Sequence, residues 1–227
     1  METLILGKWM TARLSAFALL SLLLALTSSL AKAEMYVAGQ VGVNIPQSLT
    51  NVEFSREGST FDENDQLLRS SLMYGAKLGY YFESLKWLGV ETEVFKTTPY
   101  LKQQHVTTLG GINFLTAPGG HLNVWTWAPA NIVVRHQMGA FEPYAGIGLG
   151  FNFSRFSVGD GASSGGGPGL NTQLGLRYRM TTHLAVFGEW KFNHARLKYD
   201  DFMGFEGHEL SVNYNAHNFV FGVAYHF

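Results

Sequence analysis

The chain ends with Phe219-Val220-Phe221-Gly222-Val223-Ala224-Tyr225-His226-Phe227, a stretch with a large apolar side chain at every second position. Successive side chains of a β-strand point to opposite faces, so the stretch predicts one apolar face and one face of small or polar residues. About nine to eleven residues of a tilted strand cross the hydrocarbon of a bilayer. The ending therefore predicts one strand of a transmembrane barrel, with Gly222, Ala224 and His226 directed inward.

Seven further segments show the same two-residue alternation. We expect strands at 35–45, 71–82, 87–95, 121–135, 143–154, 170–180 and 184–194. Within 121–135, one face is expected to hold Leu122, Val124, Ala128, Ala130, Ile132 and Val134. Short links at 83–86, 136–141 and 181–183 alternate with long ones near 46–70, 96–120, 155–169 and 195–211.

An even strand number with alternating short and long links is typical of single-chain bacterial outer-membrane barrels, whose short turns face the periplasm. The sequence thus predicts an all-β fold: an eight-stranded antiparallel up-and-down transmembrane β-barrel with both termini in the periplasm. A soluble sandwich or lipocalin-like barrel is the alternative, but its inward strand faces would be apolar rather than charged.

The only long apolar run lies near the N-terminus, at residues 16–26, and Arg13 precedes it. Ala31-Lys32-Ala33 follows as a small-x-small site of the kind that signal peptidase cleaves. We expect a signal peptide at 1–33 and one barrel domain at 34–227, with translation starting at Met1 or Met10. An uncleaved anchor is the alternative, although the apolar core is short for a spanning helix.

Composition argues against several functional classes. The 227 residues carry a formal net charge of −1 and include no cysteine. Nucleic-acid binding needs a concentrated basic surface, which is absent, and the lack of thiols excludes thiol catalysis and thiolate metal sites. We expect no metal or other cofactor, because metal-ligand spacing is missing among His105, His121, His208 and His217.

Charged residues of both signs occupy the inward phase of several predicted strands. Side chains can fill the interior of an eight-stranded barrel, so we expect an ionic plug rather than an open channel. Arg177 or Arg179 is expected to pair with Glu189, because a tight turn joins their strands. The expected lumen network consists of Lys77, Glu91, Glu93, Arg135, Arg177, Arg179, Glu189 and Lys191.

Two further patterns concern side-chain size. Aromatic residues near the short turns predict an interfacial girdle. They are Tyr80, Tyr81, Phe82, Trp87, Phe141, Tyr144, Tyr225 and Phe227. Gly146, Gly148 and Gly150 share the inward phase of one strand and are expected to leave room for opposed arginine, Trp125 or Trp127 side chains. The glycine-rich stretch 159–169 is typical of a flexible loop.

Three stretches resemble the outer-membrane protein β-barrel domain superfamily, the eight-stranded group of OmpA-like transmembrane domains and OmpW-like small barrels. They are Glu142-Pro143-Tyr144-Ala145-Gly146-Ile147-Gly148-Leu149-Gly150, Phe187-Gly188-Glu189-Trp190-Lys191-Phe192 and the terminal Phe227. The resemblance implies location in a Gram-negative outer membrane, while activities in the group differ. It also implies a closing strand that the barrel assembly machinery reads. The expected assembly signal is Phe219, Phe221, Gly222, Val223, Tyr225 and Phe227.

Three functions are compatible with these features. The first is a small non-enzymatic barrel with a mostly filled lumen, serving envelope structure or surface interaction through extracellular loops. The second is a narrow porin-like channel or carrier for small solutes. A lipid A-modifying enzyme is least favoured, because Phe192-Asn193-His194-Ala195-Arg196 has alanine where a His-x-Ser pair needs its nucleophile. Expected partners are outer-membrane lipid, lipopolysaccharide and the assembly machinery; the chain is expected to be monomeric.

Overall fold

The computed structural model describes residues 34–56, 59–63, 67–102, 104–108, 112–117, 119–158, 161–201 and 207–227. Every regular element in these ranges is a β-strand, and no helix in them is long and apolar enough to cross a membrane. Residues Glu34–Phe227 form one compact unit. The expected signal peptide at 1–33 lies outside the described residues and stays a prediction.

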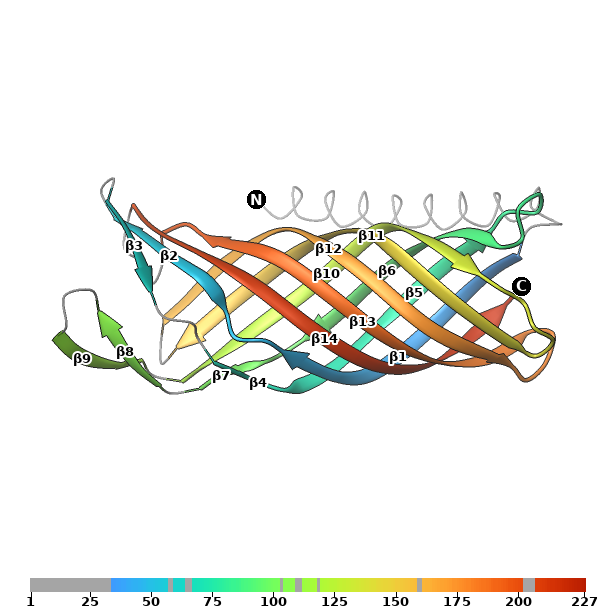
Figure 1. The fold of residues 1–227 in the computed structure, drawn as a ribbon, viewed down its shortest axis with the longest axis horizontal. Helices are drawn as coiled ribbons and strands as arrows, with labels where there is room; N and C mark the ends of the chain where they lie inside the picture. The colour runs from blue at the N-terminus through green and yellow to red at the C-terminus, as the bar shows by residue number, and fades with distance from the viewer. Residues whose placement is uncertain are drawn as a thin grey trace, which may run out of the picture. The chain divides into compact units, whose positions relative to one another are not determined.

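Eight long antiparallel strands form a closed ring (Figure 1). In order around the ring they are β1 (Glu34–Pro46), β5 (Ser71–Tyr81), β6 (Leu88–Thr97), β10 (Gly120–Arg135), β11 (Phe141–Val158), β12 (Gly161–Arg179), β13 (Leu184–Tyr199) and β14 (His208–His226). The last strand pairs back with the first, from Tyr36 opposite His226 to Pro46 opposite Ala216. Each strand otherwise pairs with its neighbour in this order, which confirms the predicted up-and-down barrel.

Short strands extend the wall at the end away from the C-terminus and the start of β1 (Figure 1). There β2 (Thr50–Arg56) continues along β14 beyond the last residue of β1, and β3 (Ser59–Glu63) pairs with β2. In the next long link, β7 (Tyr100–Leu101) pairs with both β10 and β4 (Leu68–Arg69). A separate hairpin is formed by β8 (Gln104–Thr108) and β9 (Ile112–Ala117).

The glycine-rich stretch expected to be a loop is mostly strand, because β11 continues to Val158 and β12 starts at Gly161. Its glycines permit close strand packing. A Cβ atom on Gly165 would lie 2.1 Å from the carbonyl oxygen of Lys198, and one on Gly167 would lie 1.9 Å from that of Arg196. Glycine in a strand often marks such a close backbone approach, so composition alone was misleading here.

A bulge at Pro129 reverses the phase of β10. The register with β11 shifts between Trp127 and Ala130, and the register with β6 shifts between Ala128 and Asn131. Proline has no N–H for the ladder and is found in strands mainly at edges and bulges. The predicted single face of 121–135 is therefore wrong. Leu122, Val124 and Ala128 are buried inside the barrel, whereas Ala130, Ile132 and Val134 face outward.

The outer wall is an apolar band, as expected for a surface that faces lipid. On β14, for example, Phe219, Phe221 and Val223 are at least half exposed. Of the residues expected in the aromatic girdle, Trp87, Phe141, Tyr225 and Phe227 are exposed on this wall. Tyr81 and Tyr144 are instead buried inside the barrel, because both lie on the inward phase of their strands.

Polarity is exchanged between the two faces of β13 and β14 toward the end away from Glu34 and Phe227. On β13 the outward residues change from Trp190 and Phe192 to His194, Arg196 and Lys198. The inward residues change over the same stretch from Glu189 and Lys191 to Ala195, Leu197 and Tyr199. An apolar core thus fills this part of the barrel; it includes Leu122, Val124, Leu197, Tyr199, Val212 and Tyr214. This part of the wall is built as in a water-soluble barrel, with apolar residues inside and polar residues outside.

Candidate functional site

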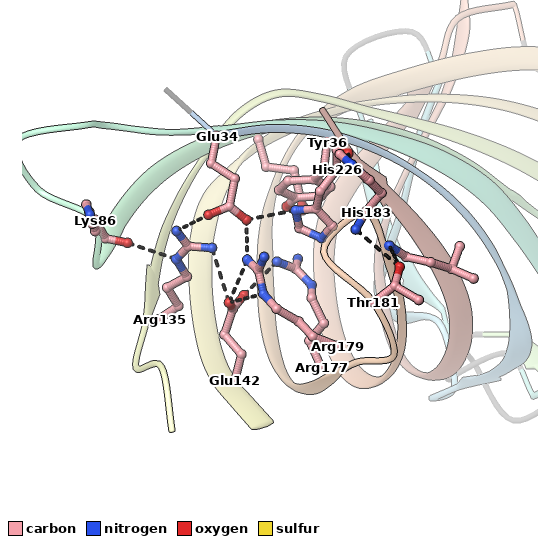
Figure 2. A network of polar contacts seen from close by, with 12 residues as sticks. Glu34, Tyr36, Lys86, Arg135, Glu142, Arg177, Arg179, Thr181, His183 and His226 are labelled. Carbon is pink, nitrogen blue, oxygen red and sulfur yellow. Dashed lines mark hydrogen bonds and ion pairs between the residues drawn. The ribbon is translucent and has the colours of Figure 1, made fainter. Parts of the chain in front are cut away.

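Charged side chains close the barrel at the end where the described chain begins and ends (Figure 2). The start of β1 meets the C-terminus there, since the backbone N–H of Phe227 donates to the carbonyl oxygen of Met35 at 3.0 Å. Side chains from five of the strands converge inside this mouth. We call them the terminal cluster: Glu34, Arg135, Glu142, Arg177, Arg179 and His226.

Two carboxylates hold the terminal cluster together. Glu142 Oε1 lies 2.7 Å from Arg177 Nη1, and its Oε2 lies 3.1 Å from Arg135 Nη1. Glu34 Oε2 accepts a hydrogen bond from Arg135 Nη2 at 2.6 Å, and its Oε1 lies 2.8 Å from His226 Nδ1. Arg179 pairs with both carboxylates. Bridging of this kind joins strands that are not neighbours in the ring, because Glu34 is on β1 and Arg135 on β10.

Aromatic rings and a turn carbonyl fix the arginines of this cluster. The Arg135 guanidinium carbon lies 3.5 Å from the centre of the Tyr81 ring, and its Nε donates to the Lys86 carbonyl oxygen at 2.8 Å. The Arg177 guanidinium carbon lies 4.4 Å from the Tyr36 ring centre. Cation–π contacts of this kind strengthen when they are desolvated. The inward tyrosines thus orient the charged groups instead of anchoring the barrel in the interface.

A second group of ion pairs, the central network, lies deeper in the barrel and consists of Lys77, Glu91, Glu93, Glu189 and Lys191. Lys77 Nζ lies 2.6 Å from Glu189 Oε2 and 3.2 Å from Glu91 Oε1. Lys191 pairs with Glu93 and, at 3.0 Å, with Glu189 Oε1. These side chains are at most 2% exposed. Burial of charges without pairing would be prohibitively costly, so each ion depends on its partners.

The two groups compensate one another in charge. The central network has three carboxylates and two ammonium groups, whereas the terminal cluster has three guanidinium groups and two carboxylates. Neutral donors also support the carboxylates of the central network: Tyr144 donates to Glu189 at 2.8 Å, and Gln173 donates to Glu91 at 3.0 Å. The interior is therefore electrically balanced only when both groups are present.

The structure places all eight residues of the expected lumen network inside the barrel, divided between these two groups. The expected pairing of Arg177 or Arg179 with Glu189 is wrong. Glu189 lies opposite Gly175 in the register, farther from the mouth than either arginine, and it pairs with the two lysines. The arginines instead meet Glu142 across the neighbouring strand pair.

Five asparagines form an amide ladder beside the central network. The hydrogen bonds run from Asn44 to Asn218 at 2.7 Å, from Asn218 to Asn193 at 2.7 Å, from Asn193 to Asn171 at 2.6 Å and from Asn171 to Asn131 at 3.0 Å. Each inner member donates through its amide nitrogen and accepts through its oxygen, which satisfies the group in a buried position. The ladder thereby spans β1, β14, β13, β12 and β10.

Gly148 on β11 makes the last step of the ladder possible. It lies between Asn131 and Asn171 in the register, and a Cβ atom there would be 2.3 Å from Asn131 Oδ1. The inward glycines therefore leave room for amide side chains. Trp125 and Trp127, expected opposite them, are about half exposed on the outer wall. This difference follows from the phase change at Pro129.

Sequence reasoning missed Glu34 and Glu142 as members of the site. Glu142 immediately precedes the predicted strand 143–154, and Glu34 precedes 35–45, so boundary errors of one residue hid both. The asparagines offered a stronger signal, since Asn44, Asn131 and Asn171 fall on the polar phase of three predicted strands. Asn193 has the same phase on a fourth predicted strand, and these four inward amides indicate a ladder, whereas Asn218 falls just before the predicted strand 219–227.

The closing strand presents its large side chains outward. Phe227 is 71% exposed and Phe221 is 70% exposed. Gly222 faces inward at a crowded point, where a Cβ atom would lie 2.3 Å from the Phe187 ring. On β13, His194 faces outward and its Nδ1 lies 2.6 Å from Asn215 Oδ1, whereas Ala195 faces inward and is buried. No cluster of three or more potential metal ligands occurs among the described residues.

Solved structures of other proteins share the fold at low sequence identity. The outer membrane protein OprG from Pseudomonas aeruginosa is 15% identical, with a TM-score of 0.59 over 86% of this chain and 96% of its own. Neisserial surface protein A is 14% identical, with a TM-score of 0.53 over 85% of this chain and 97% of its own. None of the curated protein sequences matches significantly.

The sequence itself carries a family assignment. Residues 17–227, which include the whole barrel, match the outer membrane protein beta-barrel domain. Together with the closed ring of eight strands, its apolar outer band and its polar interior, this match gives the localisation. The chain belongs to the outer membrane protein beta-barrel domain family and is a small β-barrel of the outer membrane of Gram-negative bacteria.

Proposed function

We propose that this protein is a non-enzymatic barrel whose lumen is closed by side chains and which serves the envelope through its structure and its extracellular loops. The observation that carries the proposal is the ion pair between Lys191 and Glu93, whose strands β13 and β6 stand opposite one another in the ring. Neither side chain is exposed. The pair therefore joins facing walls across the middle of the lumen.

Three successive barriers support a closed lumen. A solute would have to separate the terminal cluster, the central network and the amide ladder in turn. Breaking a buried ion pair leaves uncompensated charges at a cost of about 3–5 kcal/mol. Such a cost at more than one level strongly opposes passive diffusion.

The arrangement around His194 supports a non-enzymatic role. Acyl transfer needs a nucleophile within hydrogen-bond reach of its base, about 2.6–3.2 Å. Here the imidazole contacts the Asn215 side chain on the outer wall, and the next residue is the inward-facing Ala195. Neither neighbour supplies a hydroxyl.

The direction of the strands supports an extracellular position for the long links. The short turns between β5 and β6, β10 and β11, and β12 and β13 lie at the end where β1 begins and β14 ends (Figure 1). Short turns of such barrels face the periplasm. The β2–β3 and β8–β9 hairpins then project outward from the cell, where rigidly supported loops commonly carry recognition.

Conductance across a planar bilayer tests the closed lumen. We expect no unitary currents from the unmodified protein and small cation-selective currents from Lys191→Gly, because that change leaves two carboxylates facing a gap. Phe219→Gly, which removes a large side chain from the outer wall, is the matched control and should remain silent. Reproducible currents from the unmodified protein would contradict the proposal.

A narrow gated channel is the second candidate, favoured by the position of Lys77 between two carboxylates. Its Nζ is within 3.2 Å of both Glu91 and Glu189, so the ammonium can exchange partners by a small movement. In this case the unmodified protein would show brief currents, and Glu91→Gln would change their frequency. Absence of currents from both proteins in the same bilayers would contradict the gated channel and favour the closed barrel.

A further inference from the structure

A group of polar residues, the polar shelf, lies on the outer wall directly beyond the apolar band. It consists of His194, Arg196 and Lys198 of β13 with Asn213, Asn215 and His217 of β14. The two strands are paired there, with His194 opposite Asn215 and Arg196 opposite Asn213. These residues begin where the interior changes from charged to apolar, so the shelf marks the outer limit of the hydrocarbon.

The lower edge of the shelf rests on aromatic rings. The His217 ring is nearly parallel to that of Trp190, with centroids 5.8 Å apart and planes at 19°, and it lies 5.1 Å from the Phe192 ring. The Gln47 amide nitrogen is 3.3 Å from His217 Nε2. Aromatic residues are enriched at the level of lipid headgroups, where one side is apolar and the other wet. The imidazole therefore stands at the headgroup level.

The upper part of the shelf offers exposed cations. Arg196 Nη2 lies 2.7 Å from Glu53 Oε2, but the two side chains are 47% and 39% exposed. Lys198 is also exposed, one strand step farther from the membrane. Pro168 on the neighbouring strand is an outward residue without a long side chain, so a ligand can approach the cations from that side.

We propose that the polar shelf binds the phosphorylated glucosamine head group of the outer-leaflet glycolipid, lipid A. Arginine and lysine donate charge-assisted hydrogen bonds to phosphate, and the amides and imidazoles donate and accept bonds with sugar hydroxyls. Acyl chains of the same molecule lie along Trp190, Phe192 and Phe219 below. Basic residues just outside a membrane span are a general means of recognising anionic lipid.

This inference rests on the proposed orientation, with both termini in the periplasm, but it does not depend on a closed lumen. Cysteine labelling in intact cells, described below, tests the orientation separately. A binding measurement in detergent is independent of both. Failure of the glycolipid site can therefore be distinguished from failure of the proposed function.

The test is native mass spectrometry of the folded protein in detergent micelles, titrated with bis-phosphorylated lipid A. Parallel titrations use dephosphorylated lipid A, phosphatidylglycerol and inorganic phosphate as a competitor. We expect bis-phosphorylated lipid A to bind about tenfold more tightly than either other lipid, without displacement by millimolar phosphate. Equal binding of phosphatidylglycerol would overturn the proposal, and so would displacement by phosphate, which would indicate a site for free anions.

Three variants locate the site. Arg196→Gln combined with Lys198→Gln should weaken lipid A binding about tenfold, whereas Glu53→Gln should strengthen it about threefold by releasing Arg196. Arg155→Gln removes one exposed, outward arginine from β11 and is the control for loss of a positive charge outside the shelf, with less than a twofold change. All variants are first checked for the compact, heat-modifiable gel band of a folded barrel. Equal losses of lipid A binding in the double variant and the control would overturn the site. A dimer of the unmodified protein that is absent from the double variant would also overturn it, because the shelf would then bind a second copy of the chain.

Discussion

Lys191 of β13 forms an ion pair with Glu93 of β6 across the full width of the barrel, and the same ammonium lies 3.0 Å from Glu189 Oε1. One side chain thus neutralises two carboxylates on different strands. Lys77 pairs with Glu91 and Glu189, so among the ion pairs of the described residues Glu93 has Lys191 as its ammonium partner.

Lys191→Met is expected to lower the free energy of unfolding by about 3–5 kcal/mol, because it leaves buried carboxylates without their counter-charge. The measurement is urea unfolding in detergent micelles, followed by tryptophan fluorescence. Lys198→Met on the outer wall of the same strand is the control, with a change within about 0.5 kcal/mol. Adding Glu93→Gln to Lys191→Met should recover part of the loss. Equal stabilities of the two methionine variants would argue against an essential pair.

Gly148→Ala should destabilise the barrel by about 1–3 kcal/mol, the usual cost of overpacking. The added Cβ would lie 2.3 Å from Asn131 Oδ1 and 2.4 Å from the Ala130 carbonyl oxygen, so the last bond of the ladder cannot form unchanged. Gly150→Ala is the matched control two residues along the same inward face, where the nearest atom is a Thr126 methyl carbon at 3.3 Å. Thermal unfolding of both variants checks the difference. A larger loss for Gly150→Ala would refute the ladder as the sensitive element.

The absence of native cysteine makes the orientation directly measurable. Asp200→Cys lies just after β13, at the end away from Glu34 and Phe227, and Thr182→Cys lies in the short turn before β13; both positions are exposed. A membrane-impermeant maleimide applied to intact cells should label only Asp200→Cys, and lysis should expose Thr182→Cys as well. Phe221→Cys, on the lipid-facing wall, should remain unlabelled in both preparations. The reverse pattern would place the termini outside the cell.

Phe227→Ala is expected to reduce the amount of folded barrel in the outer membrane several-fold without altering the stability of molecules that do fold. Phe227 is 71% exposed on the outer wall, so its removal creates no cavity in the interior. The measurement compares the heat-modifiable fraction in cells with refolding from urea into detergent. Phe219→Ala, on the same face of β14, is the control. If refolding falls as far as assembly, the ring stabilises the fold and is not part of an assembly signal.

Much of this fold is predictable because alternate residues of a barrel strand face lipid or lumen and have the matching polarity. The alternation of Val41 and Val43 with Gln40 and Asn44 already separates lipid from lumen, and the same reasoning places Glu93 and Lys191 inside. The bulge at Pro129 was harder to predict from the alternation, since one extra residue reverses the face to which every later side chain of β10 points. Proline within an otherwise regular strand was the available signal for it.

The ion pairs within the lumen were harder to predict than the identity of the charged residues that face it. Arg177 and Glu189 are close in sequence, but the relative stagger of strands around the ring sets their heights, and that stagger cannot be read from local alternation. The same limit applies to the glycine-rich segment. Gly165 and Gly167 fit either a mobile loop or tightly packed strands. Only the close approach of the β13 carbonyl oxygens to these glycines shows that they lie in packed strands.

Because polarity is exchanged along β13 and β14, the stabilities of the two parts of the barrel depend on temperature in different ways. Around Leu197 and Val212, burial removes apolar surface from water, so the hydrophobic effect stabilises this region and weakens on cooling. In the lipid-embedded part the apolar wall remains in an apolar solvent, and cohesion comes from the backbone ladder, the ion pairs and the amides. Cold should therefore loosen the water-exposed end of the barrel first, while the membrane-embedded ring stays closed.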